Sequence, residues 1–182
     1  KSFKVPLHPF LGCIGVAPLS KKNEILSFFP GEFGGNLDFS GITQGATVYL
    51  PVFHDGAFLY FGDGHALQGD GELAGNALET SMNVEFTVHL IKKPPQPLTN
   101  PRVEDALYIM AIGIDKTIND AFKSATEELL KWLQQDYKLS IQEAVQVAST
   151  SVEYTIAEIA DPKVAVVAKI KKELLKNLTK IK

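Results

Sequence analysis

Hydrophobic and polar residues alternate with a period of two at several places in the first half of the chain. Apolar residues at every second position from 82 to 90 predict an antiparallel strand with one buried and one solvated face. Apolar runs at 46–53 and 57–61, separated by Asp55-Gly56, predict a β-hairpin. Shorter strands are expected at 12–16, 25–29 and 73–80. This half is therefore predicted to be mainly β.

The pattern changes to a helical period after residue 101. Apolar residues recur at helical spacing from 118 to 133, and Thr117 with Asp120 resembles an N-terminal cap. The segment 140–143 matches a capping box that opens a second helix. Strands are expected again at 155–160 and 164–167. Two helices with short strands predict a small α+β lobe.

A proline-rich stretch separates the two patterns. Four prolines lie between residues 92 and 101, which suits a stiff connector. We therefore expect a β portion over 1–93, a connector over 94–101 and the α+β lobe over 102–182. The whole chain is predicted to be mainly β.

Composition and charge narrow the classes of function. The formal net charge of -3 gives no electrostatic footprint for nucleic acid. No apolar run has transmembrane length and no signal peptide is evident, so we expect a soluble, cytoplasmic protein without a membrane partner. Cys13 is the single cysteine, which excludes an intramolecular disulfide and a cysteine-rich zinc site, and its apolar context is typical of a small packed hydrophobe. The lysine-rich end at 169–182 is expected to be a solvated helix or tail.

The densest group of ionisable side chains lies at 62–72, on a backbone with four glycines. It combines three carboxylates, an imidazole and an amide, namely Asp63, His65, Gln68, Asp70 and Glu72. Oxygen and nitrogen ligands with a nearby acid/base carboxylate suit a divalent cation and a hydrolytic water. A solvated surface loop is the alternative interpretation. A second small polar cluster, Asn36 with Asp38, follows a glycine pair and is also compatible with a plain turn.

The spacing of these residues excludes several other kinds of site. The glycines do not form G-x-G-x-x-G, no Walker lysine follows them, and the order of the acids does not fit an EF-hand. No G-x-S-x-G elbow is present, although a Ser/His/Asp triad, which is recognised by geometry, stays open. Metal-assisted hydrolysis is the chemistry that the central stretch favours.

The same stretch resembles the acetamidase/formamidase family. The resemblance is carried by 62–65, 68–72 and 77–79, and it continues through 8–12, 15–18, 34–38, 41–42, 45–46, 128–129, 132–133, 139–140, 143–144 and 164–167. It implies a jelly-roll-like β-sandwich elaborated by an α+β portion. It also implies hydrolysis of formamide or acetamide to the carboxylate and ammonia, with a divalent metal, zinc, or calcium as the alternative.

Residue by residue, the resemblance assigns roles to the central stretch. Asp63 and His65 are expected to bind the metal, and Glu72 is expected to move protons. Four further residues are expected to orient substrate, water or the metal ligands, or to line the pocket: Asn36, Asp38, Gln68 and Asp70. The motif match fixes the positions, whereas these roles are hypotheses about chemistry.

The resemblance further implies an N-terminal portion, with its own β-structure and His/Asp-containing motifs, ahead of the segment matching 1–18. Its absence from these residues would expose sheet edges and apolar surface. We therefore expect a second polypeptide that completes the site, or a longer parent chain, and a homo-oligomer. Two alternatives are a non-catalytic metal-binding or assembly β-domain derived from the amidase fold and a structural calcium-binding protein. The presence of Gln68 and a histidine among the acids favours the amidase.

Overall fold

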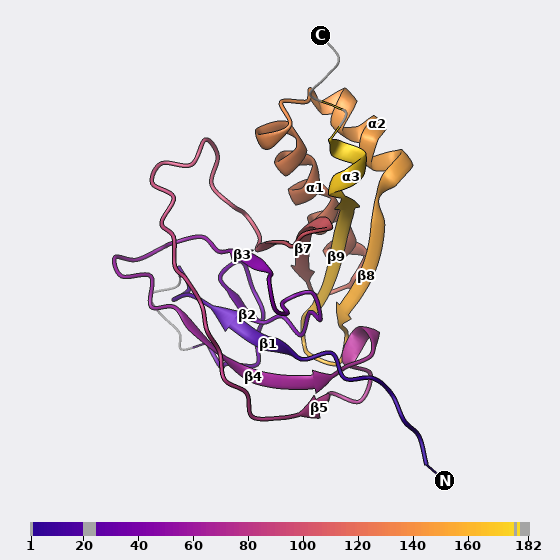
Figure 1. Cartoon of the computed structure of the whole chain (residues 1–182). Coiled ribbons are helices and arrows are strands. Elements are labelled where there is room, and N and C mark those ends of the chain that lie inside the picture. The colour runs from indigo at the N-terminus through magenta and orange to yellow at the C-terminus, as the bar shows by residue number, and fades with distance from the viewer. Residues whose placement is uncertain (1, 20–24, 177, 179–182) are drawn as a thin grey trace.

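The first half of the chain builds a four-stranded antiparallel sheet (Figure 1). The computed structural model describes residues 2–19, 25–176 and 178. In spatial order the strands of this sheet are β2 (Gly34–Asn36), β1 (Phe10–Gly15), β4 (Tyr60–Leu67) and β5 (Leu78–Glu79). A short 3-10 helix, η1 (Asp70–Glu72), lies between β4 and β5. The strand expected at 12–16 is thus confirmed as part of β1.

A second antiparallel sheet of five strands carries the helices (Figure 1). Its strands in spatial order are β3 (Thr47–Tyr49), β6 (Arg102–Glu104), β7 (Tyr108–Asp115), β9 (Val164–Lys171) and β8 (Glu153–Glu158). The helices are α1 (Ile118–Asp136), α2 (Ile141–Ser151) and α3 (Lys172–Leu175). Strand β3 precedes the proline-rich stretch yet pairs with β6, which follows it. The mainly β class and the helix pair are confirmed.

The central strands of the second sheet are buried on both faces. On β7, Ile109 and Ala111 pack in one core with the helices, whereas Met110 and Ile112 pack in another core with residues of the first sheet. A strand covered on both sides needs a nearly continuous apolar sequence, which is what β7 and β9 have. The second core therefore holds the two sheets together and supports the strands that carry the polar side chains described below.

Both predicted helix starts are confirmed. The Thr117 side chain accepts a hydrogen bond from the Asp120 amide, and Ser140 with Glu143 forms a complete capping box. No helix among the described residues is long and apolar enough to cross a membrane.

Helix α1 lies directly against β7 at Gly113. A Cβ atom at this position would lie 2.0 Å from the carbonyl oxygen of Ala121 and 2.2 Å from the amide nitrogen of Ala125. Only glycine leaves room for the helix backbone here, so the helix packs directly on the sheet.

Several strand predictions are wrong. The Asp55-Gly56 hairpin does not form, because β3 pairs with β6 while β4 pairs with β1 and β5. The segments 25–29 and 82–90 contain no strand, and the strand expected at 73–80 is reduced to β5. Local pattern shows that a segment is compatible with a strand, but hydrogen-bond partners elsewhere in the chain decide whether it becomes one.

The lysine-rich end also differs from the predicted solvated helix or tail. Its first residues complete β9, and α3 follows directly, with Leu175 buried in the helical core. Residues 177 and 179–182 lie outside the described residues. Cys13 packs as the expected small hydrophobe, and burial, followed by the charges of Asp63 and Asp38, raises the pKa of its thiol to about 12.

Candidate functional site

The central acidic stretch belongs partly to a strand. Asp63 and His65 lie on β4, two residues apart and therefore on the same face of the strand, where a loop was predicted. Facing them across the β1–β4 pair is Gly12. A Cβ atom at Gly12 would lie 2.5 Å from Asp63 Oδ2 and 2.7 Å from Asp38 Oδ1. The missing side chain of this glycine leaves the space in which the polar groups meet.

His65 is the centre of this group and is only 1% exposed. Its Nε2 atom lies 3.2 Å from Asp63 Oδ2, 3.4 Å from Glu79 Oε1 and 3.8 Å from Asp38 Oδ1. The ring of Phe10 packs against the imidazole at a centroid distance of 5.0 Å, with an interplanar angle of 82°. Three carboxylates from separate parts of the chain thus converge on one imidazole nitrogen.

Gln68 determines which nitrogen of His65 carries the proton. The Gln68 amide nitrogen donates to two backbone carbonyls, that of Asp38 at 2.7 Å and that of Ala157 at 3.1 Å. Its oxygen therefore faces His65 Nδ1, at 2.8 Å, and can only accept. In the neutral ring Nδ1 is then the protonated nitrogen, and the lone pair of Nε2 points toward the carboxylates.

This arrangement fits a divalent cation. A lone pair among three carboxylate oxygens is repulsive unless a cation lies between them or the carboxyls take up protons, and one cation would attract all of these atoms at once. Asp38 Oδ1 is buried and has no hydrogen-bond partner. Donor atoms bound to one tetrahedral zinc at about 2.0–2.2 Å lie about 3.4 Å apart, comparable to the spacing around His65. Asp38, Asp63 and His65 offer atoms that lie within 4.8 Å of one another.

A second group of carboxylates adjoins the first. Helix η1 is tied to the end of β8 by the Ile159 amide, which donates to the Gly71 carbonyl at 3.1 Å. This contact brings Glu72 beside Glu158, and each has a carboxylate oxygen within 4.8 Å of one on Asp38. Glu158 is fully buried, and its Oε2 atom has no hydrogen-bond partner. Asp38 belongs to both groups, and Glu72 also connects them, because it has an oxygen within 4.8 Å of atoms on His65 and Glu79.

Asn36 and the β8–β9 turn orient the remaining atoms. Asn36 Nδ2 donates to Asp38 Oδ2 at 2.5 Å and to Asp161 Oδ2 at 3.3 Å. The Asp161 amide in turn donates to Glu158 Oε1 at 2.7 Å. Asn36 thus holds one oxygen of Asp38 and leaves the other directed at His65.

Crowding of buried acids changes their protonation. Burial raises the pKa of Asp38, and the charges of Glu72, Asp63, Glu158 and Asp161 add to this, so that the pKa reaches about 9. Burial also raises the pKa of Glu158 to about 7 and raises those of Glu72 and Asp161. Without a cation, this cluster therefore holds extra protons near neutral pH.

Three of these carboxylates lie on unusual backbone. Asp38, Asp63 and Glu72 have φ values of 43°, 59° and 44°. Positive φ is uncommon for residues other than glycine and costs free energy, so such positions are enriched at functional sites. The fold thus maintains a strained backbone at the positions where the acids meet.

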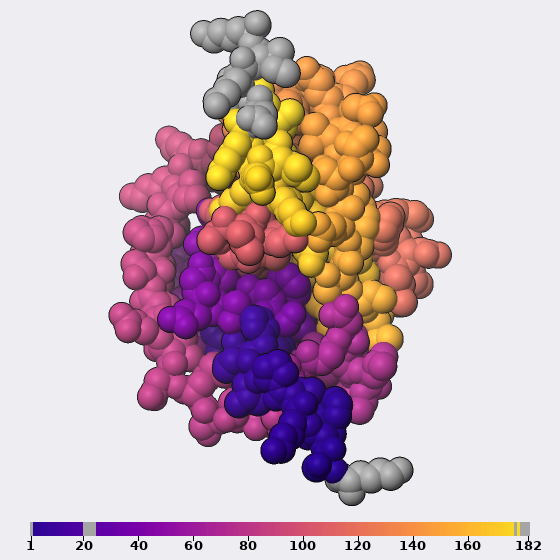
Figure 2. Space-filling view, turned by 45° about the vertical axis from the view of Figure 1, so that its right-hand side comes forward, coloured from indigo at the N-terminus to yellow at the C-terminus, as the bar shows by residue number. Residues whose placement is uncertain are grey.

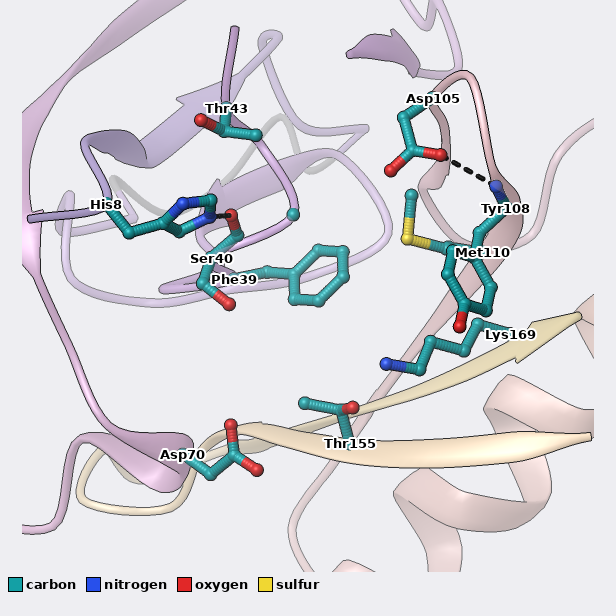
Figure 3. Close-up of a pocket in the computed structure, with 11 residues that line it drawn as sticks. His8, Phe39, Ser40, Thr43, Asp70, Asp105, Tyr108, Met110, Thr155 and Lys169 are labelled. Atoms are coloured by element: carbon teal, nitrogen blue, oxygen red, sulfur yellow. Dashed lines mark hydrogen bonds between the residues drawn. The ribbon is translucent and has the colours of Figure 1, made fainter. Parts of the chain in front are cut away.

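Most of the predicted site residues are brought together, and one is not. Asn36, Asp38, Asp63, His65, Gln68 and Glu72 form the two adjoining groups. Asp70 is exposed and instead lines a separate cavity of about 370 Å³ with Thr155, Tyr108 and Lys169 (Figure 3). Sequence reasoning missed Glu79, Glu158 and Asp161. Only Glu158 left a signal, because a glutamate stands alone in the apolar run 156–160.

The fold and the site together define a class: a mainly β protein of two sheets in which a buried histidine meets several carboxylates, in an arrangement that suits a divalent cation. Residues 23–176 match the acetamidase/formamidase family. The chain belongs to this family, as the resemblance in its sequence indicated.

Sequence matches to individual proteins support this assignment. The chain is 29% identical to a formamidase from Methylophilus methylotrophus over 153 residues, which cover 72% of this chain and 37% of that protein. It is 37% identical to an acetamidase from Mycolicibacterium smegmatis over 111 residues, covering 53% and 27%. The matched region thus spans 37% and 27% of these two curated relatives, well under half of each.

Solved structures show the same relationship. The crystal structure of a predicted acetamidase/formamidase from Thermoanaerobacter tengcongensis superposes with a TM-score of 0.87 at 32% identity, covering 96% of this chain and 56% of that one. An acetamidase from Bacillus halodurans superposes with a TM-score of 0.80 at 28% identity, covering 97% and 58%. The fold is therefore shared over nearly all of this chain and over little more than half of each relative.

Proposed function

We propose that this chain carries the metal-binding and proton-transfer part of an amidase that hydrolyses formamide, acetamide or a similarly small amide to the carboxylate and ammonia. The observation that carries the proposal is the lone pair of His65 Nε2, directed by Gln68 into a group of carboxylates with Glu72 beside it. Family membership and the names of the relatives, formamidase and acetamidase, support this reaction.

Asp38, Asp63 and His65 would hold the metal. The imidazole ligand favours zinc, whereas an all-oxygen set would favour calcium, which is the alternative. When bound, the metal would polarise the amide carbonyl and lower the pKa of a coordinated water. Asn36 and Gln68 would keep Asp38 and His65 in position through the hydrogen bonds described above.

Glu72 would move the proton. Its carboxylate would accept a proton from the attacking water as the new C–O bond forms. It would then deliver the proton to the amide nitrogen as the C–N bond breaks, releasing ammonia. Burial raises the pKa of Glu72, and the acid lies beside Glu158. A raised pKa makes the carboxylate a better acceptor of the proton from water and moves the group toward neutral pH, where one side chain can both accept and deliver a proton.

We also propose that activity belongs to a larger assembly. The chain spans 56% and 58% of the solved relatives, so further polypeptide is needed to form the whole family fold. A second polypeptide or the rest of a longer chain would supply it, and copies of the complete unit would associate as a homo-oligomer.

The test uses Glu72→Gln in the complete, zinc-loaded assembly. Ammonia release from formamide and acetamide is measured with and without chelator, together with the metal content of each sample. We expect the variant to retain its metal and to lose turnover by roughly 10²- to 10⁴-fold, the usual contribution of a general acid/base. Glu127→Gln, on the exposed face of α1, is the matched control and should behave as the unmodified protein.

Two results would contradict the proposal. Full activity in Glu72→Gln would remove the glutamate from its role. Metal binding without ammonia release from either amide would favour the alternative function, a non-catalytic metal-binding or assembly domain derived from the amidase fold.

A further inference from the structure

The segment 82–91 follows β5 as extended chain without a backbone partner. The last backbone hydrogen bond before it is donated by Thr80 to the Gly64 carbonyl, at 2.7 Å. Within the described chain, no backbone–backbone hydrogen bond involves residues 82–91. In Figure 1 this part of the chain bows away from the sheets, and in Figure 2 it runs along the left edge of the molecule.

Its side chains have the pattern of a strand with one core face. The odd positions, Asn83, Glu85, Thr87 and His89, are polar, and the even positions are apolar. Three of the apolar side chains are mostly exposed: Phe86 at 55%, Val88 at 66% and Leu90 at 65%. Apolar residues at every second position predict burial on one face, yet nothing in the described chain covers this end of it.

The neighbouring strand also has a free edge. Strand β5 pairs with β4 only at His65 and Leu67, so the Tyr60–Gly62 end of β4 is paired with β1 alone. The Phe61 ring on this end contacts the Phe86 ring, with centroids 4.8 Å apart. The free edge of β4 therefore adjoins the apolar face of 82–91. Unpaired strand edges with apolar side chains commonly pair with an added strand.

We infer that 82–91 is a strand whose partner comes from the part of the family fold that these 182 residues do not span. The partner is a β-strand of alternating apolar and polar residues. It would donate backbone hydrogen bonds to 82–91 and cover Phe86, Val88 and Leu90. More than two fifths of the Thermoanaerobacter relative lies outside the region matched by this chain, which is enough polypeptide to supply such a strand.

Hydrogen exchange tests this inference directly. The 182-residue chain is measured alone and mixed with the separately expressed portion of the Thermoanaerobacter relative that lies outside the match. We expect the chain measured by itself to be a monomer with fast amide exchange over 82–91. In the mixture we expect a one-to-one complex in which alternate amides of 82–91 exchange at least about tenfold more slowly. No amide substrate is used, so the result is independent of whether hydrolysis occurs.

Two variants separate strand pairing from nonspecific adhesion. Val88→Asp places a charge on the apolar face and should weaken the complex at least about tenfold, because a charge buried against an apolar partner loses its hydration. Thr87→Asp places the same charge on the polar face and should change the affinity less than about threefold. Both positions are exposed in the chain alone, so neither variant should impair its folding.

Other outcomes overturn the inference. Concentration-dependent dimers of the chain alone, with 82–91 protected, would identify a second copy as the occupant. A complex that leaves 82–91 in fast exchange would show that the partner strand is not supplied by that portion of the family fold. No complex at all would show the same when circular dichroism establishes that the added portion is folded. Equal effects of Val88→Asp and Thr87→Asp would exclude a one-sided apolar contact.

Discussion

At the scale of single residues, Gln68 has the most specific geometric role. It cannot be rotated without losing two bonds to carbonyls, so it always presents an acceptor to His65 Nδ1. Groups behind a metal-binding histidine fix its tautomer, and their loss typically reduces metal affinity 10- to 100-fold.

Replacing Gln68 therefore tests the site without touching a proposed metal ligand. We expect Gln68→Ala to lower zinc affinity about 10- to 100-fold, measured by competition with a chelator. Gln68→Glu keeps an acceptor for Nδ1 and should retain more affinity than Gln68→Ala. The nitrogen chemical shifts of His65 should show protonated Nδ1 in the parent chain and in Gln68→Glu, but not in Gln68→Ala. Unchanged affinity and tautomer in Gln68→Ala would contradict the role.

The sequence identified the candidate site residues that are close together in the chain, and the resemblance added Asn36 and Asp38, but neither pointed to Glu158 or Asp161. Asp63, His65 and Glu72 lie within ten residues, so their composition alone suggested a cation site. Glu158 is far away in the sequence and reaches the cluster because η1 is bonded to the end of β8. Tertiary contacts of this kind leave no periodic signal in the sequence. Asp70 is the opposite case: it is close to the other site residues in the sequence, yet it lies outside the cluster in the structure.

Among the secondary-structure elements, β1 makes room for the site because Gly12 has no side chain. A methyl group at Gly12 would overlap Asp63, Asp38 and His65, whereas a methyl group at Gly62, on the paired strand, would meet nothing within 4 Å. The two glycines thus form a matched pair, one facing the cluster and one facing open space.

Gly12→Ala should displace the site while leaving the sheet intact. We expect at least a tenfold loss of zinc affinity and a stability loss of about 1–3 kcal/mol, the usual cost of overpacking. Gly62→Ala should bind zinc normally and unfold within about 1 kcal/mol of the parent chain. Calorimetric titration with zinc and denaturant unfolding check both variants. Equal behaviour of the two would show that the space at β1 is not needed.

The elements themselves were predictable where their signals are local. Helices α1 and α2 begin at the expected caps, because capping is decided within four residues. The hairpin predicted from Asp55-Gly56 does not form, because its two segments pair elsewhere. Strand β4 pairs with β1 and β5, and β3 pairs with β6. The alternating pattern at 82–90 is that of a strand, but no partner for it lies within the described chain.

At the scale of the whole molecule, buried acids couple stability to pH and metal. The carboxyls with raised pKa are neutral in the folded chain at a pH where they are ionised in the unfolded chain. The unfolded chain therefore binds fewer protons than the folded chain, and stability falls as pH rises. The relevant window runs from about pH 4 to the folded pKa values, about 7 for Glu158 and about 9 for Asp38.

The metal-free chain should therefore lose stability between pH 5 and pH 9. Thermal unfolding in chelator, followed by circular dichroism, should show a midpoint that decreases across this range. Added zinc should restore the midpoint at pH 8 and release protons, because the ligands must be deprotonated to bind it. Asp38→Asn, which also tolerates positive φ, should flatten the pH dependence. A midpoint that increases from pH 5 to pH 8 would contradict the protonated cluster.

Strand β3 also determines when the second sheet can be completed. Thr47 pairs with Glu104, more than fifty residues later, so on the ribosome this strand emerges long before its neighbour. The nascent chain must keep residues 47–49 unpaired until β6 and β7 have been synthesised. Long-range pairing of this kind slows folding, and it makes completion of the sheet a late event in the biogenesis of the protein.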